Sequence, residues 1–164
     1  MPAIPANDPR LTWSGIYSLE KGDGWVKPWR VPFRDLDLYS PGISGLAGRA
    51  EMPSGARLRF ATDAMALTII TEPLAEDGNF DLVIDNEIVA NTAYKAGATQ
   101  VAFTPLPSGD KTVEIWLSPA MPVAVRHLEL PYGTTLEKSA DTRLKWVTYG
   151  SSITHCRSAG SPAT

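Results

Sequence analysis

The chain has 164 residues and a formal net charge of −3, with 43% hydrophobic and 20% charged residues. Such values are typical of one folded domain, and basic residues scattered along an acidic chain do not indicate nucleic-acid binding. No apolar run approaches the roughly eighteen residues of a membrane span, and a single cysteine, Cys156, excludes an internal disulfide. Residues 1–10 lack the apolar core of a secretion signal, so a cytoplasmic location is the default expectation.

Short runs of β-branched and aromatic residues follow one another between 14 prolines and 13 glycines. After an N-terminal extension over 1–10, the pattern predicts strands over 11–19, 25–33, 46–52, 57–61, 66–72, 80–84, 87–92, 99–103, 111–117 and 123–130. Short strands separated by turn residues favour an all-β, jelly-roll-like β-sandwich over 11–131. Its expected core comprises Phe60, Leu67, Ile69, Leu82, Ile84, Val101, Phe103, Val113, Ile115, Val125 and Leu128.

Local pattern predicts one hairpin and one strand face in detail. The strand over 80–84 is followed by Asp85-Asn86 and then by the strand over 87–92, which is the spacing of a two-residue turn, although the glycine common in such turns is missing. In 111–117, apolar residues at every second position are expected to face the core, while Trp116 faces the other side.

The character of the sequence changes after residue 131. Residues 132–142 are small and polar and predict a linker, whereas 143–149 form a more continuously apolar strand of the kind that is buried in parallel sheets. Gly150 then interrupts the strand, and Ser152 follows at the position where open α/β folds carry their sites. The sequence therefore predicts that a second, α/β unit starts over 143–164.

Ser152 is the candidate nucleophile of that unit. A nucleophilic serine needs an exposed hydroxyl, backbone N–H groups for an oxyanion, and a histidine base oriented by an acid. Gly150 permits a sharp turn, and a helix beginning after Ser152 would direct its backbone amides toward the site. Taken alone, the pattern is also that of an ordinary serine-rich turn after a strand.

The segment Tyr149-Gly150-Ser151-Ser152-Ile153-Thr154 resembles the first conserved block of the SGNH, or GDSL-type, hydrolases. The segments 80–85, 111–118 and 126–130 are similar to the β-sandwich that precedes the hydrolase domain in one bacterial subgroup. This resemblance implies an acyl-ester hydrolase in which Ser152 is the nucleophile and its backbone amide contributes to the oxyanion hole. It also implies an acylated carbohydrate or another acylated small molecule as the substrate, and it implies no cofactor.

The chain departs from that family pattern in several ways. Ser151 stands where the family has an aspartate, and the later blocks with a glycine, an asparagine and an Asp-x-x-His pair are not found. His127 is expected to be structural, and His155, three residues after Ser152, is not assigned as the base. We therefore expect a truncated hydrolase domain whose remainder belongs to the parent chain. No metal site is expected, because ligand spacing is absent.

The five tryptophans suggest an alternative function. Exposed tryptophans stack on sugar rings, whereas most tryptophans fill cores. Trp25 and Trp29, flanked by Gly, Pro and basic residues, are the candidate carbohydrate contacts of a stand-alone binding or interaction module without catalysis. A further expectation is self-association through apolar side chains of the C-terminal segment, since an unsupported strand edge tends to pair with another chain.

Overall fold

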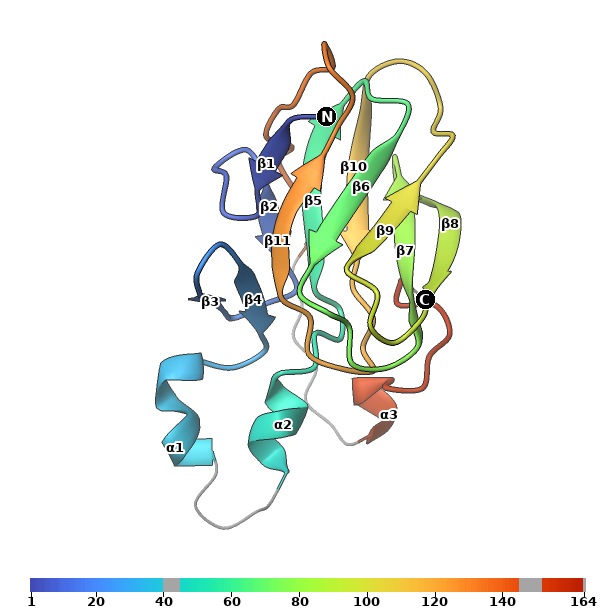
Figure 1. Cartoon of the computed structure of the whole chain (residues 1–164). Coiled ribbons are helices and arrows are strands. Elements are labelled where there is room, and N and C mark those ends of the chain that lie inside the picture. The colour runs from blue at the N-terminus through green and yellow to red at the C-terminus, as the bar shows by residue number, and fades with distance from the viewer. Residues whose placement is uncertain (40–44, 145–151, 164) are drawn as a thin grey trace.

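Two antiparallel sheets face each other in the computed structural model, which describes residues 1–39, 45–144 and 152–163 (Figure 1). The first sheet has the order β3 (Ser18–Lys21), β4 (Val26–Trp29), β11 (Val125–Glu129), β6 (Leu67–Thr71) and β9 (Gln100–Phe103), with β1 (Ala3–Pro5) also paired to β11. The second sheet has the order β2 (Thr12–Ser14), β5 (Arg57–Thr62), β10 (Lys111–Trp116), β7 (Gly78–Ile84) and β8 (Glu87–Tyr94). The predicted all-β sandwich is confirmed.

Short helical segments lie at one end of the sandwich (Figure 1). They are η1 (Phe33–Asp35), α1 (Leu36–Tyr39), α2 (Leu46–Ala50) and α3 (Ser152–His155). Within the described ranges, none of the helices has the length and apolar character needed to cross a membrane.

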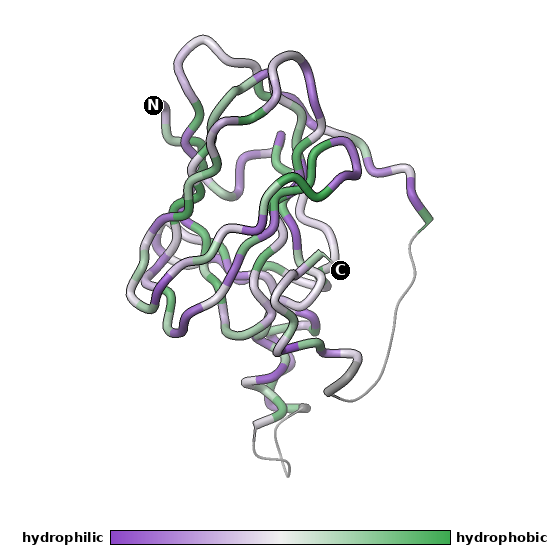
Figure 2. Tube along the Cα trace, turned by 90° about the vertical axis from the view of Figure 1, so that its right-hand side faces the viewer, coloured by the Kyte–Doolittle hydropathy of each residue, from purple (hydrophilic) through white to green (hydrophobic). Residues whose placement is uncertain are grey.

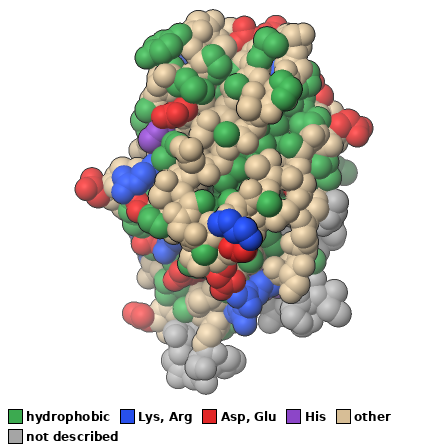
Figure 3. Space-filling view, turned by 45° about the vertical axis from the view of Figure 1, so that its right-hand side comes forward, with side chains coloured by type: hydrophobic (Ala, Val, Ile, Leu, Met, Phe, Trp, Pro, Cys, Tyr) green, Lys and Arg blue, Asp and Glu red, His purple; other side chains and the backbone are tan. Residues whose placement is uncertain are grey.

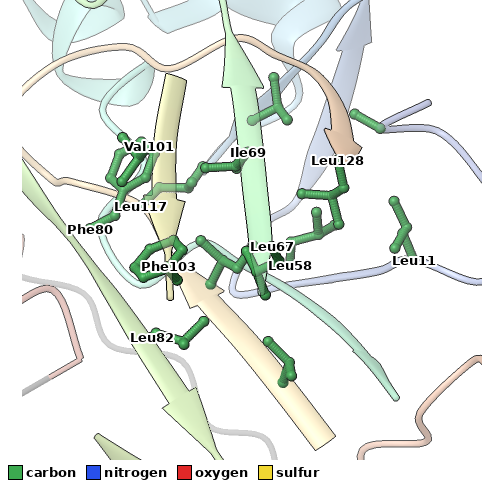
Figure 4. Packing of buried hydrophobic residues seen from close by; sticks show 14 of the residues in the cluster. Leu11, Leu58, Leu67, Ile69, Phe80, Leu82, Val101, Phe103, Leu117 and Leu128 are labelled. Atoms are coloured by element: carbon green, nitrogen blue, oxygen red, sulfur yellow. The ribbon is translucent and has the colours of Figure 1, made fainter. Parts of the chain in front are cut away.

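The core lies between the two sheets. Every residue predicted for it is buried, from Phe60 at 0% exposure to Ile84 at 5%. Figure 4 shows side chains of both sheets, such as Ile69 and Phe80, directed into one cluster, and Figure 2 shows hydrophobic and hydrophilic residues alternating along the chain. This alternation places apolar side chains on the inner face of each strand, and their burial supplies the main stabilising free energy of the sandwich.

The predicted hairpin is also confirmed. β7 and β8 are joined by Asp85 and Asn86, whose φ angles of 50° and 74° are both left-handed. Two left-handed residues define a type I′ turn, and Asn and Asp adopt this conformation more easily than other residues with a Cβ atom. Asp85 adds a local contact, because its Oδ1 accepts the Thr112 backbone N–H at 2.9 Å.

Three local predictions are wrong. Residues 46–52 were expected to form a strand, but Leu46–Ala50 form α2, and this segment lacks the alternation that one buried face of a strand requires. The expected strand over 11–19 is interrupted at Gly15, which has φ of +71° and lies so close to Gly55 that an added Cβ would be 1.9 Å from the Gly55 carbonyl oxygen. Residues 3–5, expected to lie in an extension, pair with β11 instead.

The chain after β11 crosses to the outer face of the second sheet. Glu137 forms an isolated antiparallel bridge with Ala61 of β5, and the Thr62 hydroxyl donates to the Thr135 carbonyl oxygen at 2.6 Å. The predicted linker thus lies against the sandwich and covers part of β5.

Candidate functional site

The outer face of the second sheet carries most of the polar contacts that involve the C-terminal part of the chain. Strand pairing places side chains in two rows across this face. The first row comprises Arg57, Trp116, Asp81 and Asn91, and the second comprises Arg59, Glu114 and Val83. Figure 3 shows acidic and basic side chains next to one another at the lower end of the view.

Glu114 is the centre of the second row and is 1% exposed. Its carboxylate accepts from Arg59 Nη1 at 2.5 Å, from Arg143 Nη2 and from the Trp116 indole at 3.0 Å. Burial acts to raise the pKa of Glu114, but the hydrogen bonds from Arg59 and Arg143 outweigh it and hold the pKa below its usual value. Arg143 therefore ties the end of the linker to the sheet.

Asp141 extends the same network. It accepts from Arg143 Nε at 2.7 Å and lies 3.4 Å from Arg57 Nη2. The hydrogen bonds from Arg143, with the nearby charge of Arg59, hold the pKa of Asp141 well below its usual range. Arg57 in turn lies over the Trp116 ring, 4.6 Å from its centroid, in a cation–π contact. Trp116 is thus on the outer face, as predicted, but its ring is covered by an arginine.

Asp81 forms a second anchor, in the first row. It is 0% exposed although it lies on the outer face, because residues 160–163 cover it. Its Oδ2 accepts from the Ser161 hydroxyl at 2.6 Å and from the Ala163 backbone N–H at 2.8 Å, and its Oδ1 accepts from Asn91 Nδ2 at 2.5 Å. Asn91 Nδ2 also donates to the Gly160 carbonyl oxygen at 2.9 Å.

The candidate nucleophile, Ser152, begins α3. The backbone of α3 is held by the Ser54 hydroxyl, which donates to the His155 carbonyl oxygen at 2.5 Å. Just after α3, Arg157 donates to the Ala120 carbonyl oxygen at 3.1 Å and pairs with Glu76 at 3.1 Å. Residues 145–151, which include most of the strand predicted over 143–149 and the turn at Gly150, lie outside the described residues. The role of Ser152 therefore stays a prediction.

His155 lies on α3 with Ser152 and is 8% exposed. Its Nε2 atom is buried and has no hydrogen-bond partner among the residues that the structure describes. Burial lowers the pKa of His155, and the charges of Arg30, Arg49 and Arg157 lower it further, so the imidazole is neutral at neutral pH. The other histidine, His127, is half-buried on β11 with Nε2 3.5 Å from Glu129 Oε1.

The two candidate sugar-contacting tryptophans lie in different environments. Trp29 is 2% exposed, donates to Glu20 Oε2 at 2.9 Å and is covered by Lys27 at 4.7 Å from its ring centroid. A ring so enclosed offers no face to a sugar, so the predicted contact does not extend to Trp29. Its burial completes the packing beside β3 and η1 instead.

Trp25 remains a candidate. It is half-buried and lines a depression of about 100 Å³ together with Asn7, Lys21 and Arg126. The indole packs against Gly22, where an added Cβ would lie 2.0 Å from Trp25 Cε2. Within the described ranges, no group of three His, Cys, Asp or Glu side chains is arranged to hold a metal ion.

The two facing antiparallel sheets define the class of the fold as a β-sandwich. The chain superposes on a putative GDSL-like lipase from Bacteroides ovatus ATCC 8483 with a TM-score of 0.62 at 13% identity, covering 85% of this chain and 43% of the lipase chain. It superposes on a family 35 carbohydrate binding module from an environmental isolate with a TM-score of 0.52 at 11% identity, covering 85% of this chain and all of the module. These likenesses are at the level of the fold.

The chain belongs to the family described as SsfX3, N-terminal domain, whose model matches residues 11–127. It is similar to the salicylyl-acyltransferase SsfX3 from a tetracycline biosynthetic pathway, with a TM-score of 0.87 at 36% identity. That similarity covers 99% of this chain and 49% of the acyltransferase chain, so this chain spans about half the length of that protein. No curated protein matches the chain.

Sequence reasoning missed Asp81, Asn91 and Glu114. An acid at an outward position of a strand, such as Asp81 in β7, is usually exposed, so its position alone predicts no contact. One signal was present: β10 carries Glu114 between apolar residues in the same strand as Lys111, and β5 carries Arg57 and Arg59. Such opposite charges on paired strands indicate a cross-strand ion pair, but not the segment that covers it.

Proposed function

We propose that this chain is the N-terminal part of a serine-dependent acyl-transfer enzyme of the SGNH type, with Ser152 as its nucleophile. The observation that carries the proposal is the 36% identity with a salicylyl-acyltransferase over 99% of this chain. The similarity thus extends past the sandwich and into the C-terminal segment that contains Ser152. A sandwich shared by itself would support only a common fold.

The chemistry follows from the nucleophile. Ser152 Oγ attacks the carbonyl carbon of an acyl ester while a base takes its proton, and the backbone N–H of Ser152 contributes to stabilising the oxyanion. The C–O bond to the leaving alcohol then breaks, and the alcohol takes that proton. Water or another hydroxyl attacks the acyl-enzyme in the second half, releasing Ser152 and giving hydrolysis or acyl transfer, respectively. We assign the base to residues other than His127 and His155.

The substrate that we propose is an acylated carbohydrate or another acylated small molecule. An esterase and an acyltransferase share the first half of the reaction and differ only in the acceptor. The depression beside Trp25 contains an aromatic face and the polar groups of Asn7, Lys21 and Arg126, which suit a hydroxyl-rich ligand.

The full-length gene product provides the test. We expect turnover of p-nitrophenyl acetate and, after a quench in acid, an acetyl group on Ser152 detected by mass spectrometry. Ser152→Ala should abolish both, and the neighbouring Ser151→Ala serves as the matched control that retains the adduct. Isolated residues 1–164 should show no turnover, because a serine without base and acid partners is a poor nucleophile. An active Ser152→Ala variant would refute the assignment.

A binding module without catalysis is the second candidate, favoured by the half-buried Trp25 ring at the depression. Titration of residues 1–164 with a panel of neutral oligosaccharides tests it, with tryptophan fluorescence as the signal. If the depression is a sugar site, Trp25→Ala removes the signal and Trp116→Ala, whose ring is covered by Arg57, retains binding. If unmutated residues 1–164 give no saturable fluorescence change with any oligosaccharide of the panel, binding of these sugars is excluded.

A further inference from the structure

The side chain of Asp81 lies on the outer face of the second sheet, yet it is fully buried. Its neighbours along β7, Phe80 and Leu82, face the core, so Asp81 projects from the opposite face. Complete burial at that position arises from the chain segment 160–163, whose end lies beside β7 and β8 (Figure 1). A buried carboxylate is tolerated only when donors replace its hydration shell.

Among the described residues, the C-terminal segment supplies two of the donors to Asp81. Ser161 Oγ and the Ala163 N–H bind Oδ2, while Asn91 binds Oδ1 and also donates to the Gly160 carbonyl oxygen. Asn79 in turn donates to Asn91 Oδ1, which fixes the orientation of the Asn91 amide. Polar groups of residues 160–163 and of the sandwich therefore pair with one another. The bonds to the Asp81 carboxylate are charge-assisted, and such hydrogen bonds are stronger than those between neutral groups.

The same segment continues back to α3. Between Ser161 and α3, Arg157 contacts Ala120 and Glu76, and the His155 carbonyl oxygen accepts from Ser54. Every one of these partners belongs to the sandwich or its loops. Residues 152–163 are thus attached to it at both ends of their length.

We propose that Asp81 and Asn91 are positioning residues for the nucleophile: by holding residues 160–163 they fix α3, and with it the segment that carries Ser152, against the sandwich. The sandwich then holds the segment that carries Ser152 in a fixed position, and is not a separate module joined to it by a flexible linker. This inference rests on the proposed function of Ser152. Asp81 and Asn91 take no part in the chemistry itself.

The first arm of the test uses residues 1–164 and needs no activity. Amide hydrogen exchange is followed at Ala159, whose N–H donates to the Cys156 carbonyl oxygen at 2.9 Å and does not contact Asp81 directly. Asp81→Ala should accelerate exchange at Ala159 about tenfold or more, since a charged hydrogen bond is lost, while Ile115 in β10 stays protected. Asp77→Ala is the matched control: Asp77 lies immediately before β7, the strand that carries Asp81, and its carboxylate binds Lys95 at 2.7 Å.

Asn91→Ala is the second variant, in case Asp81→Ala fails to fold. Asn91 lies on the edge strand β8 and is exposed, so its replacement should leave the sandwich folded while it removes the bonds to Asp81 and Gly160. Unchanged exchange at Ala159 in a folded Asp81→Ala or Asn91→Ala variant would overturn the proposal.

The second arm uses the full-length protein. Asp81→Ala should lower kcat for p-nitrophenyl acetate about tenfold or more with KM within about twofold, because a misplaced nucleophile affects the chemical step. The rate of Ser152 labelling by a fluorophosphonate should fall in parallel, and Asp77→Ala should leave both unchanged. If exchange accelerates while kcat is unchanged in an active enzyme, the positioning role is refuted. If the unmutated full-length protein forms no Ser152 adduct, the proposed function fails instead. The hydrogen-exchange measurement then still decides whether Asp81 and Asn91 hold α3 against the sandwich.

Discussion

Glu114 illustrates how a single acid organises the outer face of the second sheet. It is nearly inaccessible and is contacted by arginines from β5 and from the linker. Removing one member of such a group leaves the remaining charges without compensation, which costs more than the net value of the pair. A conservative change of Glu114 is therefore expected to destabilise the chain.

We predict that Glu114→Gln lowers the free energy of unfolding by about 2 kcal/mol, because hydrogen bonds to a charged group are lost in a buried position. Urea denaturation of residues 1–164 measures the change. Glu87→Gln, at an exposed position on β8, should alter the free energy by less than about 0.5 kcal/mol. Equal values for the two variants would show that the network adds nothing to stability.

The same residue predicts a pH dependence. Burial raises the pKa of Glu114, but the arginine hydrogen bonds lower it by more, so the folded value lies below the unfolded value of about 4.3. A group with a lowered pKa contributes stability above the unfolded pKa and loses it as pH falls through the folded pKa. The difference in unfolding free energy between the parent and Glu114→Gln should thus be constant from about pH 6 to 7 and should shrink below about pH 4. A difference that grows in acid would contradict this sign.

At the scale of single elements, the connections between strands depend on residues that tolerate left-handed backbone. Asn86 has φ of 74° in the β7–β8 turn. Asn86→Val should destabilise the chain by about 1–2 kcal/mol, because a β-branched residue is strained in this region. Asn86→Gly should change stability by less than about 0.5 kcal/mol or increase it, since glycine is common at this turn position. Chemical denaturation of both variants is the measurement, and identical midpoints would refute the turn assignment.

Gly15 separates β2 from β3 and has no room for a side chain. With φ of +71° and the Gly55 carbonyl oxygen at 1.9 Å from an added Cβ, Gly15→Ala should cost more than about 2 kcal/mol of stability. Gly48→Ala, in α2 with nothing within 4 Å of the added atom, should instead be neutral or stabilising by up to about 1 kcal/mol. Thermal unfolding of both variants is the measurement. Equal melting temperatures would show that the positive φ and close contact at Gly15 do not matter, and that replacing any glycine has the same effect.

The elements that the sequence predicted share one property, which is that their signal is local. Alternation in 111–117 and the Asp85-Asn86 spacing determine strand faces and a turn without knowledge of distant residues. Other features that the sequence did not predict depend on partners far along the chain: β1 is a strand because it pairs with β11, and Asp81 is buried because residues 160–163 cover it. Trp29 likewise contacts Glu20 and Phe33, and the composition of the chain does not show that these residues meet.

At the scale of the whole molecule, the two faces of the sandwich differ in what remains accessible. The outer face of the second sheet is covered in part by residues 132–143 and 160–163, whereas the depression beside Trp25 lies on the first sheet, next to β4. A ligand of the sandwich therefore has access at Trp25 without displacing the C-terminal segment. The C-terminal segment thus covers part of the second sheet, while the depression on the first sheet stays open.

Self-association through the C-terminal segment remains a prediction. Leu144, just after the linker, is 97% exposed, and Trp146 lies outside the described residues. Exposed apolar residues of this kind favour contacts between chains, so Trp146→Asp should reduce any dimer of residues 1–164 measured by light scattering. Circular dichroism should show that the sandwich stays folded. Loss of the fold in Trp146→Asp would show instead that the segment is integral to the sandwich.

The chemistry of the covered face has a consequence for how the protein is made. During synthesis the sandwich leaves the ribosome before residues 152–163, and domains fold as units from the N-terminal side. Until the later segment arrives, the outer face presents Asp81, Glu114 and the arginines of β5 to water. Charged side chains on an uncovered sheet oppose pairing with other chains. Before the C-terminal segment is made, this face therefore exposes charged side chains, which favour aggregation less than an apolar face of the same extent.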